Sequence, residues 1–209
     1  MALINCAPTR MTRIKNYVPK QKTIQVVAFP QNGMYSYGEE GKTGRDLVEE
    51  ALELGCEVVG GIPHNEWSRE LGEKSIKEIV NLAVKHNKLI DVHCDETDDV
   101  MARFLEVLNA EAMMKGIAKK TTASHNCSFG SSDDSYAFRM MGLFRKSKIN
   151  FVSLPTENAF LQGRQDTYPK RRGITRVREF VDNDINVCFG KDSIVDLWYP
   201  AGNGTVSYT

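Results

Sequence analysis

Strand-like and helix-like segments alternate along most of this chain, and the alternation restricts the fold more than any other feature. The strand-like segments are short apolar runs bounded by turn residues, and the helical segments carry apolar residues three and four positions apart. This order predicts parallel strands joined by outer helices, which is the α/β class. The predicted strands are residues 24–29, 57–62, 89–92, 121–124, 149–154 and 185–189, and the predicted helices are residues 45–54, 75–85, 98–115, 136–146 and 175–181.

Two closures fit such a chain: an open doubly wound sheet, or part of an eight-stranded barrel. The glycine-rich motifs that mark nucleotide sites on open sheets, GxGxxG and GxxxxGK[ST], do not occur. Strand carboxyl ends converge on one face of a barrel and form its active site, so polar residues at successive strand ends favour a partial (β/α)8 TIM-type barrel of about six units. The residues in these positions are Gln31, His64, His93, His125 and Asp192.

The amino-acid composition limits which partners this protein can bind and in which cellular compartment we expect it. The 209 residues include 27 basic and 27 acidic side chains, which argues against a general nucleic-acid binder. No apolar run reaches membrane-spanning length, and residues 1–22 show no secretory pattern. The five scattered cysteines contain no CxxC pair and predict reduced thiols. We therefore expect a cytoplasmic protein without nucleic-acid or membrane partners, with residues 1–22 as a poorly ordered lead-in and residues 23–209 as the barrel domain.

The stretch LIDVHCDETDD, residues 89–99, carries the strongest chemical signal. A buried strand would deliver His93 to its carboxyl end and place Glu96 one short loop away. An imidazole can bind a divalent cation, and a nearby carboxylate can shuttle protons to and from a metal-bound water. On this stretch alone, a hydrogen-bonded rim histidine followed by the solvated start of a helix explains the pattern equally well.

Several motifs resemble bacterial cytosine deaminase and its relatives in the amidohydrolase superfamily. The similarity runs from about Val26 to Gly202 and rests on the sequences VVAFPQNG, GGIPH, LIDVHCDETDD, TASH, QGRQDTYPKRRGITRV and INVCFGKDSIVDLWYP. The resemblance implies a metal-dependent hydrolytic deaminase on a (β/α)8 barrel, acting on cytosine or a related amino-pyrimidine or amino-heterocycle. It also implies one divalent metal, iron or zinc, and we expect a homo-oligomer.

The resemblance assigns metal-binding and catalytic roles to four residues. His93 and Asp192 match metal ligands, and Glu96 matches the proton shuttle. His125 matches the histidine that positions the metal-activated water, and Asp192 would also accept a hydrogen bond from that water. The expected catalytic residues are therefore Glu96, His125 and Asp192.

Three further residues match substrate-binding positions of the family. Gln31 matches the glutamine that reads the pyrimidine edge, and a side-chain amide offers the donor and acceptor that a cyclic amide requires. Trp198 matches an aromatic wall of the pocket. Ser193 stands on the amine side of the substrate, where the best-known cytosine deaminases have an acid, which points toward another amino-heterocycle.

The chain also departs from the family pattern. The family holds its metal with four ligands that include an HxH pair, and no HxH pair occurs here. The first two barrel strands and the small β domain of the family have no recognisable counterpart in the sequence, which suggests truncation at the N-terminus. Lys191 stands where the family usually has histidine, and its ammonium would repel a cation. The alternative to an active deaminase is therefore an inactive fragment that does not retain the metal and persists as a subunit or an unstable remnant.

Overall fold

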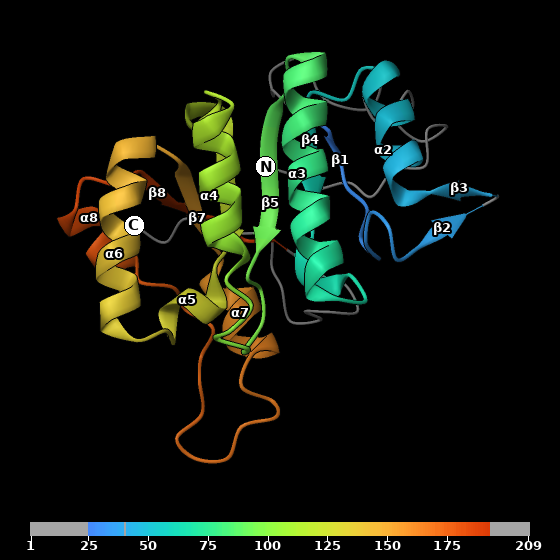
Figure 1. Ribbon diagram of the computed structural model, residues 1–209. Helices are drawn as coiled ribbons and strands as arrows, with labels where there is room; N and C mark the ends of the chain where they lie inside the picture. The colour runs from blue at the N-terminus through green and yellow to red at the C-terminus, as the bar shows by residue number, and fades with distance from the viewer. Residues whose placement is uncertain (1–24, 40, 193–209) are drawn as a thin grey trace, which may run out of the picture. The chain divides into compact units, whose positions relative to one another are not determined.

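The computed structural model describes residues 25–39 and 41–192 (Figure 1). The chain divides into two compact units, the first ending at Val92 and the second beginning at His93. The predicted lead-in, residues 1–22, lies outside the described residues. Within the described part, none of the helices has the length and apolar character needed to cross a bilayer.

The first unit is built from short strands and two longer helices. Helix α3 packs against β4, and α2 packs against α3. Thr43 caps α2 through a reciprocal capping box with Asp46, and α3 ends at Asn87 in a left-handed conformation. The elements are β1 (Val27–Ala28), β2 (Gly38–Glu39), β3 (Lys42–Thr43), α2 (Gly44–Glu53), β4 (Val58–Gly61), the 3-10 helix η1 (Pro63–Asn65), α3 (Arg69–His86) and most of β5 (Leu89–Cys94).

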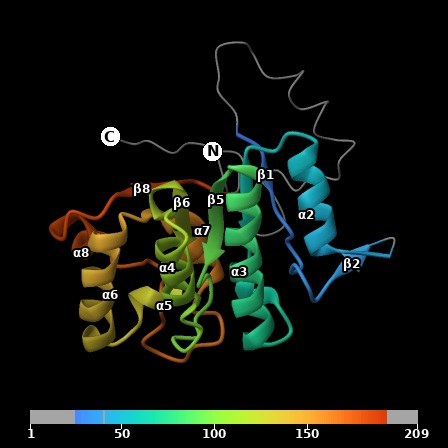
Figure 2. The ribbon, with the colours of Figure 1, turned by 45° about the horizontal axis from the view of Figure 1, so that its top comes forward.

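The second unit continues the strand–helix alternation. Helices α4 and α6 lie side by side in both views (Figures 1 and 2). The elements after β5 are α4 (Phe104–Met114), η2 (Ala118–Lys120), β6 (Thr121–His125), α5 (Cys127–Gly130), α6 (Asp134–Ser147), β7 (Asn150–Ser153), α7 (Pro155–Leu161), α8 (Val177–Asp182) and β8 (Val187–Phe189).

A cluster of phenylalanines fastens the helices of the second unit to its strands. Phe180 of α8 stacks on Phe151 of β7 with ring centroids 4.2 Å apart, and on Phe129 at 5.8 Å. Phe144 of α6 meets the edge of the Phe151 ring at 4.9 Å. Buried aromatic pairs of this kind bury large apolar areas and add their own pairwise attraction. The cluster therefore fixes α6 and α8 against β7.

The main sheet confirms the predicted fold class. Its six strands run in the order β1-β4-β5-β6-β7-β8, and the pairs β1–β4, β4–β5, β6–β7 and β7–β8 are parallel. Parallel strands that neighbour one another in chain order, with helices between them, are the consecutive βα units of a partial (β/α)8 barrel. The hairpin of β2 and β3 forms a separate antiparallel pair.

Helix α4 begins later than the sequence predicts. The predicted helix begins at residue 98, but α4 starts at Phe104. The buried Asp95 carboxylate accepts hydrogen bonds from the N–H groups of Phe104 at 2.9 Å and Leu105 at 3.0 Å. A carboxylate at a helix N-terminus satisfies orphan donors and complements the helix dipole. The cap thus comes from the end of β5, and it ties the β5 loop to α4.

Replacing Asp95 with alanine should therefore loosen both the helix and the loop. Asp95 is 2% exposed, so the two N–H groups would lose a partner in a buried place. We expect Asp95→Ala to lower the free energy of unfolding by roughly 1–3 kcal/mol. The exposed Asp99 serves as the control, since Asp99→Ala should change stability much less. Urea denaturation followed by circular dichroism measures both, and equal stability of the two variants would contradict the capping role.

Candidate functional site

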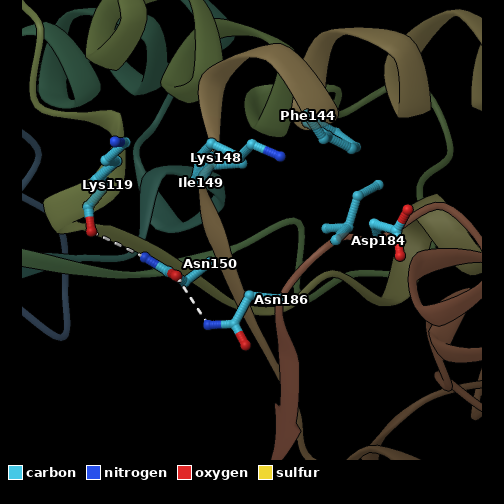
Figure 3. Close-up of a pocket in the computed structure, with 8 residues that line it drawn as sticks. Lys119, Phe144, Lys148, Ile149, Asn150, Asp184 and Asn186 are labelled. Atoms are coloured by element: carbon cyan, nitrogen blue, oxygen red, sulfur yellow. Dashed lines mark hydrogen bonds between the residues drawn. The ribbon is translucent and has the colours of Figure 1, made fainter.

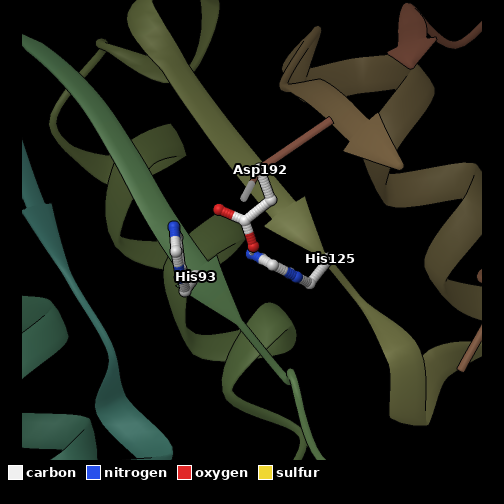
Figure 4. Close-up of side chains that lie close together, drawn as sticks. All are labelled: His93, His125 and Asp192. Atoms are coloured by element: carbon white, nitrogen blue, oxygen red, sulfur yellow. Dashed lines mark ion pairs between the residues drawn. The ribbon is translucent and has the colours of Figure 1, made fainter. Parts of the chain in front are cut away.

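Polar side chains gather at the carboxyl ends of the strands in the second unit. His93 is the penultimate residue of β5, His125 is the last residue of β6, and Asp192 follows β8 by three positions. Figure 4 shows these three side chains converging from separate segments. Glu96 joins them from the loop after β5. The structure therefore brings together the four residues for which the sequence predicted catalytic or metal-binding roles.

The backbone turns sharply where these residues leave their strands. Asp95, His125, Asn126 and Asp192 all have positive φ angles, of 56°, 70°, 55° and 67°. Residues other than glycine adopt this left-handed region infrequently, and such positions concentrate at functional sites. The Asn126 N–H donates to the Cys94 carbonyl at 3.0 Å, which binds the end of β6 to the end of β5. The turns at His125 and Asp192 lie where their side chains approach His93 (Figure 4).

Glu96 lies between two imidazoles. Its Oε1 is 3.1 Å from His125 Nδ1, and its Oε2 is 3.5 Å from His93 Nδ1. The two rings are 4.3 Å apart between centroids. The Glu96 side chain is 11% exposed and that of His125 is fully buried. A carboxylate in such a place requires compensating charge and hydrogen bonds, and the imidazoles supply them.

The electrostatics of this pair favour the charged forms. Burial would raise the pKa of Glu96, but His125 and His93 outweigh burial and hold that pKa well below its usual range. Burial would likewise lower the pKa of His125, yet the Glu96 carboxylate, with help from Asp192 and Asn158, raises it to about 9. Glu96 is therefore ionised at neutral pH, and a cation at His125 Nε2 would take the place of a proton.

Asn158, on α7, completes the cluster and was not predicted. Its Nδ2 lies 3.2 Å from Glu96 Oε1, and its Oδ1 lies 3.2 Å from His125 Nδ1. No helix is predicted between the strand that ends at residue 154 and the helix that begins at residue 175, whereas α7 spans Pro155–Leu161. The signal that could have found the helix is Pro155 directly after the β7 segment, because proline favours the first position of a helix.

The donor atoms of His93, His125 and Asp192 fit a divalent cation. One ligand atom from each lies within 4.8 Å of the others. His125 Nε2 is buried without a hydrogen-bond partner among the described residues, and it is 3.6 Å from Asp192 Oδ2, too long for a hydrogen bond. Two ligands of one tetrahedral zinc ion are about 3.4 Å apart, so this spacing suits a shared ion. The two ligand atoms that lie farthest apart, within 4.8 Å, would have to move closer together to bind the same ion.

Of the three predicted substrate-binding residues, the structure describes only Gln31. Gln31 lies in the turn after β1, in the first unit, where its backbone carbonyl accepts a hydrogen bond from Asn65 Nδ2 at 3.0 Å. Its contact with substrate stays a prediction. Ser193 and Trp198 lie outside the described residues. Lys191, which we expected to repel a cation, donates a hydrogen bond to Thr156 Oγ1 at 3.3 Å.

A cavity of about 290 Å³ opens at the other end of the strands, away from the Glu96 cluster (Figure 3). Asn150, the first residue of β7, donates there to the Lys119 carbonyl, and Asn186 donates to Asn150 Oδ1 at 2.9 Å. The side-chain amides of Asn150 and Asn186 thus form hydrogen bonds within the protein, and no histidine is among the lining residues. In a barrel, this end contributes to stability while the carboxyl end carries the chemistry. The cluster around Glu96 is therefore the candidate active site.

Imidazoles and carboxylates that surround a common point at the carboxyl ends of parallel strands also occur in metal-dependent hydrolases built on barrels. Residues 7–209 match the amidohydrolase family, and the chain belongs to this family.

Two curated relatives and one solved structure show the range of similar proteins. The chain is 29% identical to a pterin deaminase of Rhizobium rhizogenes over 63% of this chain and 30% of that protein. It is 26% identical to an N-isopropylammelide isopropyl amidohydrolase of Pseudomonas sp. over 87% of this chain and 40% of that protein.

The solved structure is 5-methylcytosine deaminase of Klebsiella pneumoniae with 5-fluorocytosine. It is 48% identical to this chain, with a TM-score of 0.89, over 94% of this chain and 47% of that one. This chain therefore spans less than half the length of each of the three proteins.

The fit of the three donor atoms generates a prediction about metal uptake. The purified 209-residue chain should bind one zinc ion, measured by competition with a chromophoric chelator. His125→Ala and Asp192→Ala should each weaken zinc binding more than tenfold, about 1.4 kcal/mol or more, because each removes a ligand. His86→Ala, on the outer helix α3, is the control and should leave the affinity unchanged. Equal affinity in all three variants would exclude this cluster as the metal site.

Proposed function

We propose that this chain is part of a hydrolytic deaminase that acts on cytosine or a related amino-pyrimidine, and that its catalytic residues lie at the carboxyl ends of the strands. The observation that supports the proposal most is the buried cluster in which Glu96 contacts His125 and His93 while His125 Nε2 faces Asp192. The 48% identity to a 5-methylcytosine deaminase supports the substrate class. Pterin, which names another relative, is also a ring that carries an exocyclic amine.

Hydrolytic deamination adds water to the amidine carbon and releases ammonia, so protons must move from the water to a ring nitrogen and to the leaving amine. Glu96 suits this task, because it is ionised at neutral pH and can accept a proton before passing it on. Asp192 can accept a hydrogen bond from the attacking water. The family resemblance assigns His125 to positioning that water, but in this cluster His125 Nε2 would instead bind the cation. The cation that His93, His125 and Asp192 would hold, zinc or iron, lowers the pKa of water toward neutrality when bound.

Substrate recognition would come from the residues that the family resemblance assigned. Gln31 would pair with the cyclic amide edge through one donor and one acceptor. Trp198 would stack against the ring. Ser193 is smaller than the acid of the best-known cytosine deaminases and carries no charge. It would leave room for a substituent beside the amine, which favours a 5-substituted cytosine.

The alternative is a chain that neither retains a metal nor turns over substrate. The absence of an HxH pair from the 209 residues favours it, because two of the four ligands expected in the family have no counterpart here. We further propose that the protein is cytoplasmic and forms homo-oligomers, the first because its five scattered cysteines contain no CxxC pair and the second from family resemblance.

An ammonia-release assay separates the two proposals. The full chain, loaded with zinc or ferrous iron, should release ammonia from 5-methylcytosine, 5-fluorocytosine or cytosine. Glu96→Gln should lower kcat by about 10²- to 10⁴-fold with little change in KM, because it removes proton transfer and keeps the shape of the site. Glu106→Gln, on the partly exposed outer face of α4, is the control and should retain activity. Metal-loaded protein without turnover on any of these substrates would support the inactive alternative.

A further inference from the structure

Asn158 contacts the two groups that the proposed reaction needs most. Its side-chain amide lies within 3.2 Å of both His125 Nδ1 and Glu96 Oε1. The residue is 1% exposed, and its backbone is held in α7 by hydrogen bonds to Leu154 and from Gln162. The helix therefore holds the Asn158 backbone in place while the side-chain amide faces the cluster. Because the residue is buried, bulk water does not compete for the hydrogen bonds of the amide.

The Asn158 amide nitrogen Nδ2 lies 3.2 Å from Glu96 Oε1 and 3.0 Å from His125 Nδ1, while the amide oxygen Oδ1 lies 3.2 Å from that same His125 nitrogen. The amide nitrogen, and not the amide oxygen, faces Glu96 Oε1, and an Nδ2–H group can donate where a carboxylate oxygen accepts. The reverse orientation would set the amide oxygen against the carboxylate, two acceptors without a proton between them. With Nδ2 donating to Glu96, Oδ1 at 3.2 Å accepts from His125 Nδ1–H, a group that Glu96 Oε1 also faces at 3.1 Å.

This orientation has consequences for both partners. His125 carries its proton on Nδ1 whether the ring is neutral or charged, so Nε2 is the nitrogen presented toward Asp192 at 3.6 Å. Glu96 Oε1 is occupied by Asn158 and His125, which leaves Oε2, 3.5 Å from His93 Nδ1, as the less engaged oxygen. An outer hydrogen bond of this kind fixes the tautomer and direction of a metal-binding imidazole.

We propose that Asn158 is a positioning residue of this active site, with a separate task for each end of its amide. The Oδ1 end keeps His125 turned so that Nε2 can bind a cation. The Nδ2 end keeps Glu96 turned so that Oε2 is the oxygen that moves protons. The second task rests on the proposed deaminase function, and the first does not.

Two substitutions separate the tasks. Asn158→Leu has nearly the same shape and removes both the donor and the acceptor. Asn158→Asp keeps an acceptor for His125 Nδ1–H but replaces the donor with a second carboxylate oxygen facing Glu96. Asn109→Leu is the matched control, because Asn109 is a second buried asparagine of the same unit, on α4, outside the cluster.

Three measurements on the full chain give the result. We expect Asn158→Leu to weaken zinc binding about 10- to 100-fold, as loss of an outer hydrogen bond to a ligand does. We expect Asn158→Asp to bind zinc within about threefold of wild type, since the acceptor persists. Both should lower kcat by at least tenfold while KM changes by less than threefold. In nitrogen-15 spectra of the histidine rings, the His125 Nδ1 proton should exchange with water at least tenfold faster in Asn158→Leu than in wild type.

The proposal is overturned if Asn158→Leu behaves like Asn109→Leu in zinc affinity and proton exchange, or if Asn158→Asp loses zinc as strongly as the leucine variant. If Asn158→Leu does not fold, Asn158→Asp decides the matter: reduced kcat with zinc retained supports both tasks, and any other pattern refutes them. Wild-type protein that releases no ammonia would refute the proposed function, while zinc affinity and proton exchange would still decide the His125 task.

Discussion

A nearly buried carboxylate is stable only where other groups compensate its charge, and Glu96 meets this requirement within one small cluster. Its two oxygens face His125 and His93, and Asn158 adds an amide donor. Removing any partner would leave a charge or a polar atom unsatisfied in a dry place. The geometry of the candidate site is therefore dictated by the same balance that makes the carboxylate tolerable.

The scaffold delivers these groups by simple rules of parallel sheets. Each strand of the second unit ends at the same edge, and left-handed turns at Asp95, His125 and Asp192 redirect the chain there. The Asp95 cap holds the loop of Glu96 against α4, and the stacked rings of Phe151 and Phe180 hold α8 against the strands. Rigid elements thus position side chains that come from distant parts of the sequence, which is what a catalytic cluster requires.

Much of this arrangement could be predicted from the sequence, for physical reasons. Apolar periodicity revealed the parallel α/β class, and the place of His93, His125 and Asp192 after apolar runs predicted their convergence. Asn158 escaped prediction because a helix of seven residues is too short to display a period. The Asp95 cap escaped because it acts nine and ten residues ahead, which local capping rules do not cover. The link between Gln31 and a substrate depends on tertiary placement that no local pattern encodes.

The central claim is that this cluster holds a catalytic cation, and diffraction tests it most directly. Crystals of the full chain grown with zinc should be measured on both sides of the zinc absorption edge. We predict an anomalous peak at about 2.0–2.2 Å from a nitrogen of His93, a nitrogen of His125 and an oxygen of Asp192. A zinc peak bound elsewhere, or none at these three residues at saturating zinc, would contradict the account.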